Sequence, residues 1–162
     1  MNFKDIFEFQ KKLDQKFLEA MNQKKRFDGF HLKITLAIIV EIAEFANEIQ
    51  SFKYWKNNKE IKKDKLLEEW ADIIHFLSSL AIDQKLNSEI KKEVVSNDLD
   101  KQLSALFTSA INLKNNVNSE NLLDTFQKTL GFLDLLNIKE QELVDAYFLK
   151  AKINLKRIET KY

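Results

Sequence analysis

Carboxylate side chains occur at helical spacing in the two most apolar stretches of the chain. Residues 36–46 and 70–82 are apolar on nearly every side, which is typical of helices that are buried all round. Offsets of three and four place side chains one above the other on a single helix face. The acids with this spacing are Glu41, Glu44 and Glu48 in or beside the first stretch, and Glu69 and Asp72 at the start of the second.

These acids could hold a metal ion. An ionised carboxylate in an apolar setting costs several kcal/mol unless it is paired or bound to a metal, and neither residues 34–52 nor residues 66–84 contain a Lys or Arg. Oxygen ligands without cysteine favour Mg²⁺, with Mn²⁺ as a substitute. A solvated acidic face explains the same spacing equally well. A di-iron site is excluded, because it needs two Glu-x-x-His motifs and the chain has none.

Composition excludes several other classes of protein. With no Pro, no Cys and two Gly among 162 residues, the chain cannot form a disulfide scaffold, a thiolate zinc site or a glycine-rich phosphate loop. Its 26 basic and 25 acidic residues give no basic excess for nucleic acid, and only two of the basic residues are arginines, Arg26 and Arg157. No apolar run approaches the ~20 residues of a membrane span. We expect no signal peptide, no membrane partner and a cytoplasmic location.

Apolar spacing near 3.6 residues predicts an all-α protein. We expect a helical bundle of about six helices with a four-helix metal-binding core, in a single domain over residues 1–162. Asn-rich breaks at 115–119 and at Asn137 separate the last three helices, because Asn readily takes the left-handed conformation that ends a helix. The helices are expected at about 3–21, 30–54, 62–84, 98–114, 120–136 and 138–157.

Longer motifs resemble a known family. The segment EIAEFANEIQSFKYWKNN at 41–58, followed by LLEEWADIIHFLSSL at 66–80, is similar to the dimeric all-α dUTP pyrophosphatases (dUTPases), within the all-α nucleoside triphosphate pyrophosphatases. FEFQKKLDQKF near the start and YFLKAKINLKRIETKY at 147–162 are similar to the end motifs of that family. The resemblance covers about 3–18, 32–84 and 147–162, and the middle of the chain carries little of it.

The resemblance implies a role for each matching position. The Mg²⁺ ligands would be Glu41, Glu44, Glu69 and Asp72. The uracil end would be formed by Gln10, Asp14, His75 and Phe76. Lys53 would lie near phosphate and Trp55 against the base or sugar, while Lys150, Asn154, Arg157 and Tyr162 would close over the phosphates and sugar. Two positions depart from the family pattern, Ala151 where Asn often follows the Lys and Lys161 where Gly often precedes the last Tyr.

The expected activity is Mg²⁺-dependent hydrolysis of dUTP, and of dUDP, to dUMP by a homodimer. Two or more Mg²⁺ ions would bridge the phosphates and lower the pKa of the attacking water. Glu44 would accept its proton, with Glu48 in reserve. The alternatives are a house-cleaning pyrophosphatase for another dNTP, a helical binding module without catalysis, and a plain bundle with an interaction role. For single residues, Arg157 could be a surface charge, Trp55 a packing residue, His75 a core histidine and Gln10 a surface residue.

Overall fold

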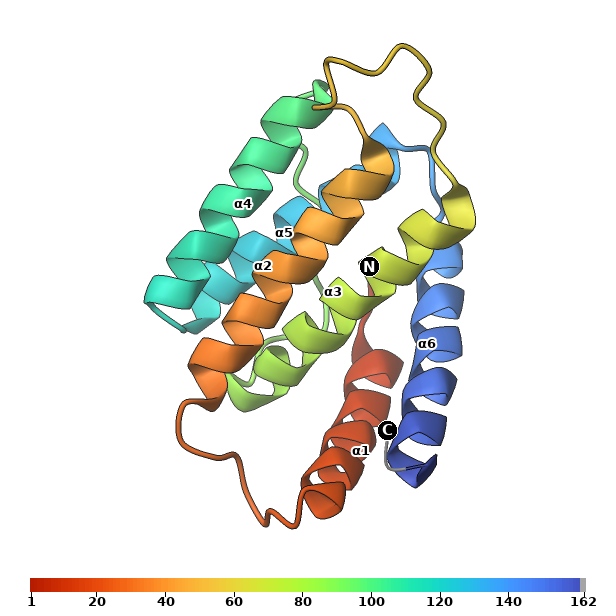
Figure 1. The fold of residues 1–162 in the computed structure, drawn as a ribbon. Helices are drawn as coiled ribbons and strands as arrows, with labels where there is room; N and C mark the ends of the chain where they lie inside the picture. Colours follow the sequence, from red (N-terminus) through yellow and green to blue (C-terminus); the bar gives the residue numbers. More distant parts are fainter. Residues whose placement is uncertain (161–162) are drawn as a thin grey trace.

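The computed structural model describes residues 1–160 and confirms the all-α fold (Figure 1). Within that part of the chain there is no β-strand, only one isolated bridge between Asn2 and Glu89. Six helices lie close to the expected ranges, with one exception treated below. They are α1 (Lys4–Ala20), α2 (Phe30–Ile49), α3 (Lys63–Asp83), α4 (Leu99–Asn115), α5 (Ser119–Leu135) and α6 (Glu140–Thr160).

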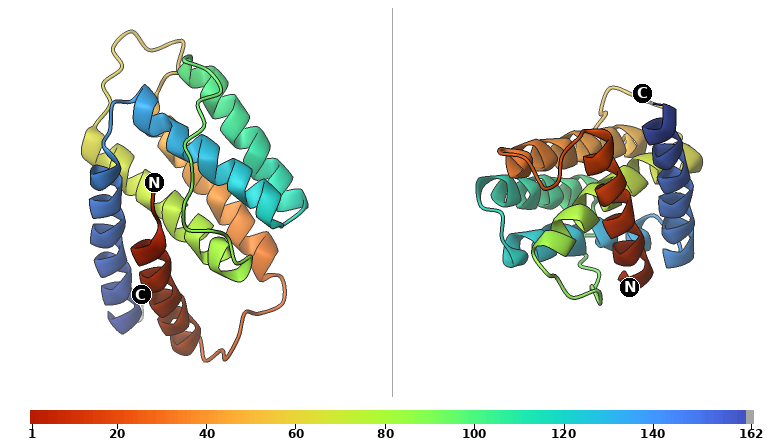
Figure 2. Two further views of the ribbon diagram at one scale, coloured as in Figure 1. Left: turned by 180° about the vertical axis from the view of Figure 1, so that it is seen from behind. Right: turned by 90° about the horizontal axis from the view of Figure 1, so that it is seen from below.

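The helices form a four-helix bundle with a further pair packed on one side. Two antiparallel hairpins, α2–α3 and α4–α5, pack together through α2 against α4 and α3 against α5. Helices α1 and α6 lie side by side and both pack on α3, as the views from the front and from behind show (Figures 1 and 2). Helix α3 is therefore central, because four other helices contact it.

Aromatic residues fill the interior of the four-helix bundle. The ring of Phe45 on α2 lies 5.1 Å from that of Trp70 on α3 and 5.2 Å from that of Phe132 on α5, measured between centroids. Helix α3 is buried nearly all round, as its apolar sequence predicts. The same prediction is wrong for α2, which leaves one apolar face open to solvent.

Helix α2 ends five residues earlier than expected. Gln50 takes the left-handed conformation, with φ of 63°, directly after the last helical residue, Ile49. Its side chain is buried, and Nε2 donates a hydrogen bond of 2.8 Å to the carbonyl oxygen of Glu60, which ties the following loop to the end of the helix. The FKYW motif at 52–55 consequently lies in this loop. The predicted break at Asn137 is confirmed, with φ of 52°.

The segment between α3 and α4 is held by a glycine on α5. A β-carbon at Gly131 would lie 2.1 Å from the carbonyl oxygen of Glu93, far inside contact distance, so only glycine allows this approach. The amide of Gln102 donates to the same Glu93 oxygen at 3.0 Å. Residues that carry no family motif thus fix this connecting segment against α4 and α5. No helix in the described part of the chain is long and apolar enough to cross a membrane.

Candidate active site

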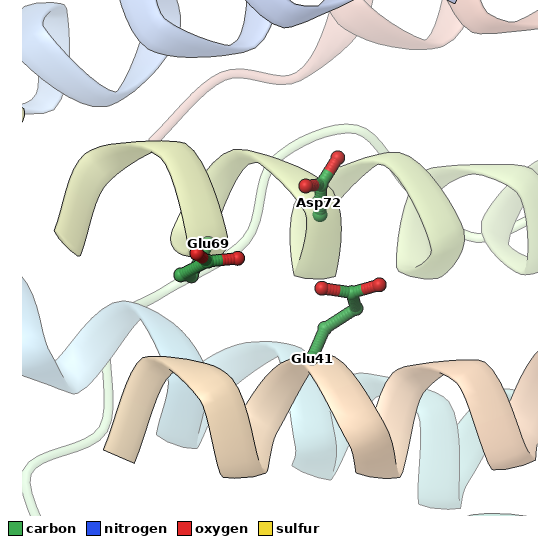
Figure 3. Close-up of side chains that lie close together, drawn as sticks. All are labelled: Glu41, Glu69 and Asp72. Atoms are coloured by element: carbon green, nitrogen blue, oxygen red, sulfur yellow. The ribbon is translucent and has the colours of Figure 1, made fainter. Parts of the chain in front are cut away.

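Three of the predicted metal ligands converge between α2 and α3. Glu41 extends from α2 toward Glu69 and Asp72, which lie one turn apart on α3 (Figure 3). One carboxylate oxygen from each lies within 4.8 Å of the others, and all three residues are half-buried. The antiparallel packing of the two helices brings together acids that are about 30 positions apart in the sequence.

The three carboxylates destabilise one another's charges. The pKa of Glu41 is raised to about 7, mainly by burial and in smaller part by the negative charges of Asp72, Glu44 and Glu69. Burial likewise raises the pKa of Glu69 to about 7, with contributions from Glu44 and Asp72. The repulsion among these acids opposes their ionisation near neutral pH. A bound divalent cation would stabilise their ionised forms.

The sequence predicts no cation beside these acids, because the two stretches contain no Lys or Arg. This prediction is wrong, since Lys150, which is distant in the sequence, lies beside them. Helix α6 places Nζ of Lys150 at 2.6 Å from Oδ2 of Asp72 and at 2.9 Å from Oε1 of Glu68. The hydrogen bond from Lys150 lowers the pKa of Glu68. The pKa of Asp72 is still raised, because burial outweighs the attraction of the lysine. One ammonium group therefore offsets part of the negative charge, but the pKa values of Glu41 and Glu69 stay raised in spite of its attraction.

The two predicted catalytic acids lie further along α2. Glu44 is exposed and is not one of the acids that could share a single cation, yet its charge contributes to the raised pKa of both Glu41 and Glu69. Glu44 is therefore at the edge of the cluster. Glu48 lies one further turn toward the end of α2 and is half-buried.

A cavity of about 450 Å³ adjoins the carboxylates. Four helices line it, α1, α2, α3 and α6, together with the loop between α1 and α2. Glu41 and Asp72 reach into it from the carboxylate cluster. The structure also brings six predicted substrate residues to its wall: Gln10, Asp14, His75, Phe76, Asn154 and Arg157. Residues from both ends of the chain thus meet at one cavity.

One part of the cavity is built from hydrogen-bonded polar side chains. Gln10 is buried, and its Nε2 donates to Oδ1 of Asp14 at 2.7 Å. Its Oε1 lies 2.8 Å from the Tyr147 hydroxyl, which donates to it, and 2.8 Å from Nδ1 of His75. The His75 ring stacks on Tyr147 at 4.1 Å between centroids. Burial lowers the pKa of His75 to about 4, so the imidazole is neutral at pH 7.

The comparison with family models decides which protein family this is. A model described as dUTPase matches residues 2–162. The chain belongs to the dUTPase family. This enzyme is therefore a dUTP diphosphatase, a hydrolase of nucleotide metabolism. A comparison with curated proteins finds no match.

Sequence reasoning did not assign Arg26 to this site of the dUTPase. Its Nη2 lies 2.9 Å from Oδ2 of Asp14 and its Nε 3.1 Å from Oδ2 of Asp83, while its guanidinium lies 4.0 Å above the Phe30 ring. Arginine is rare in this chain, which is a signal in favour of a specific role. Its partners are up to 57 positions away, so the sequence could not reveal them. Ser79 and Tyr147 were missed for the same reason.

Three predicted substrate residues of this dUTPase do not line the cavity: Lys150 contacts Asp72 beside it, whereas Lys53 and Trp55 lie farther away. Lys53 donates from Nζ to the carbonyl oxygen of Asn47 at 3.0 Å, and Trp55 is 63% exposed. Both lie in the loop after the C-terminal end of α2, whereas the cavity follows the first half of that helix. At 1.5 Å per residue, even Glu41, the cavity-lining residue nearest to the end of α2, is ~12 Å from Ile49 along the axis. Tyr162 and the departure at Lys161 lie outside the described residues.

Proposed function

We propose that this dUTPase hydrolyses dUTP and dUDP to dUMP in a Mg²⁺-dependent reaction, with release of pyrophosphate or phosphate. The observation that carries the proposal is the convergence of Glu41, Glu69 and Asp72 beside a cavity that also holds a network of hydrogen-bonded polar side chains. The acids suit cations and a phosphate chain, and the network suits a base. The cavity joins the two, as a nucleotide requires.

The donor set supports Mg²⁺ as the cation. All three grouped side chains offer carboxylate oxygens, and Glu44 stands at the edge of the group as a fourth. Mg²⁺ prefers such ligands together with water and substrate phosphates, and Mn²⁺ can replace it. Two or more bound cations would supply charge neutralisation on the phosphates and a lowered pKa for a nearby water. The raised pKa values of Glu41 and Glu69 support the same assignment, because cation binding would offset the repulsion.

The acids beside the cluster would accept the proton of the attacking water. The proposed proton acceptor is Glu44, because its carboxylate is exposed and free to face a water at the edge of the cluster. Glu48 would serve only if Glu44 is engaged as a ligand. A Glu44→Asp variant that retains activity where Glu44→Gln loses it would support this role.

Of the cationic side chains, Lys150 would bind both an acid of the cluster and the phosphates, and Arg157 would bind the phosphates. Lys150 is 2.6 Å from Asp72, so it would orient that ligand as well as face the phosphates. Arg157 and Asn154 line the cavity from α6, and a guanidinium can grip a phosphate through two parallel hydrogen bonds. Gln10, Asp14, His75 and Phe76 would surround the uracil. The position of Tyr162 in this scheme stays a prediction.

The exposed apolar face of α2 supports a homodimer. Leu32, Leu36 and Val40, spaced four residues apart, are 51%, 46% and 52% exposed, and contiguous apolar surface of this kind marks interaction sites. In a dimer formed through this face, Lys53 and Trp55 could reach the nucleotide of the partner subunit. Sedimentation would test it: a Leu36→Glu, Val40→Glu double variant should be monomeric, whereas a dimer of unchanged affinity would contradict it. We also propose that the chain forms a single domain, which limited proteolysis would test. A cytoplasmic location is proposed as well, and cell fractionation would test it.

Pyrophosphate release from each dNTP tests the activity. With Mg²⁺ we expect turnover of dUTP well above that of dCTP, dTTP, dATP and dGTP, and none in EDTA. Preferred turnover of another dNTP would instead identify a house-cleaning pyrophosphatase. Tight binding of a non-hydrolysable dUTP analogue without turnover of any dNTP would indicate a binding module and would contradict the proposal.

A further inference from the structure

Asp72 is held by a lysine and a second acid that both lie outside the cavity. Asp72 lines the cavity, whereas Lys150 and Glu68 line a separate groove of about 490 Å³ between the start of α3 and α6. Nζ of Lys150 lies 2.6 Å from Oδ2 of Asp72 and 2.9 Å from Oε1 of Glu68. Lys150 therefore reaches Asp72 from the side of the groove, and its ammonium group is shared with Glu68, an acid that the proposed function does not use.

The three side chains differ in their exposure to solvent. The side chain of Lys150 is 9% exposed, that of Asp72 16% and that of Glu68 53%. Glu68 and Asp72 are four residues apart on α3, so they share a helix face on which their negative charges repel each other. An exposed carboxylate adds little to the stability of the fold, because solvent screens its charge. The contact of Glu68 with Lys150 therefore matters mainly for where the ammonium group lies.

Without Glu68, the carboxylate cluster would attract the ammonium group further inward. Lys150 carries its charge at the end of a flexible four-carbon chain. One oxygen of Asp72 lies within 4.8 Å of an oxygen of Glu41 and of an oxygen of Glu69. The charge of Lys150 already acts to lower the pKa of both glutamates, against burial, which raises it. A short rotation about Asp72 would bring the ammonium group closer to them, and it would neutralise the charge that attracts a divalent cation.

We propose that Glu68 is a positioning residue, which holds Lys150 on the outer side of Asp72 and so keeps the ammonium group from replacing the divalent cation at Glu41 and Glu69. This inference rests on the proposed function, since it assumes a divalent cation in the cluster. Glu68 acts only through Lys150 in this scheme. The lysine pairs with Asp72 and Glu68, and the charges of Glu41 and Glu69 stay available to the cation.

Binding of Mn²⁺ in the absence of nucleotide tests the inference, because the electron paramagnetic resonance signal of the free ion weakens on binding. Glu68→Gln should weaken Mn²⁺ binding by about 10-fold, the lower end of the effect of side chains that support metal ligands. The control Asp145→Asn removes the same charge from the wall of the same groove, and it should change binding by less than about 2-fold. Unchanged binding in Glu68→Gln, or an equal loss in both variants, would overturn the inference.

A double variant shows whether Glu68 acts through the lysine. In a Lys150→Met background, Glu68→Gln should have no further effect on Mn²⁺ binding, because no ammonium group is left to move. Thermal unfolding in EDTA establishes that the variants are folded. A loss of Mn²⁺ binding that is equally large with and without the lysine would overturn the inference.

The Mg²⁺ dependence of dUTP turnover gives a further readout that needs only the single variant. In Glu68→Gln the Mg²⁺ concentration for half-maximal turnover should rise by about 10-fold. At saturating Mg²⁺ the kcat should stay close to that of the unaltered enzyme, because enough Mg²⁺ displaces the ammonium group. A lower kcat that added Mg²⁺ does not restore would overturn the inference. If the unaltered protein turns over no dNTP, the proposed function fails, while Mn²⁺ binding still decides the role of Glu68.

Discussion

The two parts of the cavity are built on opposite electrostatic principles. Around Glu41, Glu69 and Asp72, like charges crowd together and one lysine compensates part of them. Around Gln10, side chains from three helices pair donors with acceptors at 2.7–2.8 Å. The carboxylate cluster keeps raised pKa values at Glu41 and Glu69, whereas the network around Gln10 leaves only one imidazole nitrogen of His75 without a partner among the described residues. The enzyme thus leaves a net negative charge in one part of the cavity, and it pairs hydrogen-bond donors with acceptors in the other.

The difference follows from how the two kinds of group are stabilised. A hydrogen bond is short-ranged and can be satisfied by one neighbour, so the network can form almost fully within the folded chain. Repulsion between half-buried carboxylates extends over several ångströms and needs a counter-charge of matching size. The four predictions below test this contrast, from the largest expected effect to the smallest.

Glu41→Gln should have the largest effect, because it removes a ligand charge and keeps the shape of the side chain. We expect dUTP turnover with Mg²⁺ to fall by about 100-fold or more, while the melting temperature without metal stays the same or rises, since one repulsive charge is gone. Steady-state kinetics and thermal unfolding in EDTA measure both. The control Glu8→Gln, on the exposed side of α1, should change neither. Activity close to that of the unaltered enzyme would refute the ligand assignment.

Lys150→Met should be the most destabilising change without metal. Its side chain is only 9% exposed, and its loss leaves the largely buried Asp72 carboxylate without its cation. Breaking such a pair costs about 2–4 kcal/mol of the free energy of unfolding, and added Mg²⁺ should recover part of it. Urea unfolding in EDTA and in Mg²⁺ measures the effect, with the exposed Lys101→Met on α4 as the control. Equal stability of the two variants would show that Lys150 does not compensate the cluster.

The metal-free protein should lose stability as the pH rises from about 4.5 to 7. Glu41 and Glu69 have pKa values of about 7 in the folded protein against 4.5 without the fold, so the folded state retains protons that the unfolded state has released. Raising the pH therefore favours unfolding over this interval. Melting temperatures in EDTA should decline across it, and Mg²⁺ should abolish the decline. A rising melting temperature in EDTA would mean that the acids are already compensated.

Tyr147→Phe should have the smallest effect, about 1 kcal/mol of stability, because it removes one neutral hydrogen bond to Gln10 and keeps the ring stacked on His75. The pH dependence in EDTA should be unchanged, since the ring lies in the hydrogen-bonded network and not among the carboxylates. Thermal unfolding across the same pH range measures this. An altered pH dependence would show that the two parts of the cavity are coupled.

Much of the fold could be predicted from the sequence, because periodic apolar residues dictate helices. The C-terminal end of α2 shows the limit. Gln50 has no strong tendency toward the left-handed conformation, and it adopts it because its buried amide finds the carbonyl oxygen of Glu60 ten residues later. Likewise, Gly131 reads as a helix-weakening residue in isolation, and only its contact with Glu93 explains it.

The candidate site divides in the same way. Spacing alone pointed to Glu41, Glu44, Glu48, Glu69 and Asp72 as acids that share helix faces, and the resemblance to a family selected four of them as metal ligands. The resemblance to a family added Gln10, His75 and Arg157, which the fold brings to one cavity. Neither route could find Arg26. Its role depends on Asp14, Ser79 and Asp83, which only the packing of α1 on α3 places around it.

The sequence by itself determined the helices, the pairs of acids and the family, because each depends on residues that are close together along the chain or on short sequence motifs. The tertiary structure alone decided which charges compensate which. Lys150 reaches Asp72 across 78 positions, and Arg26 reaches Ser79 across 53. Such contacts exist only after α1 and α6 have packed on α3, since electrostatic and hydrogen-bond partners are chosen by distance in space and not by distance along the chain.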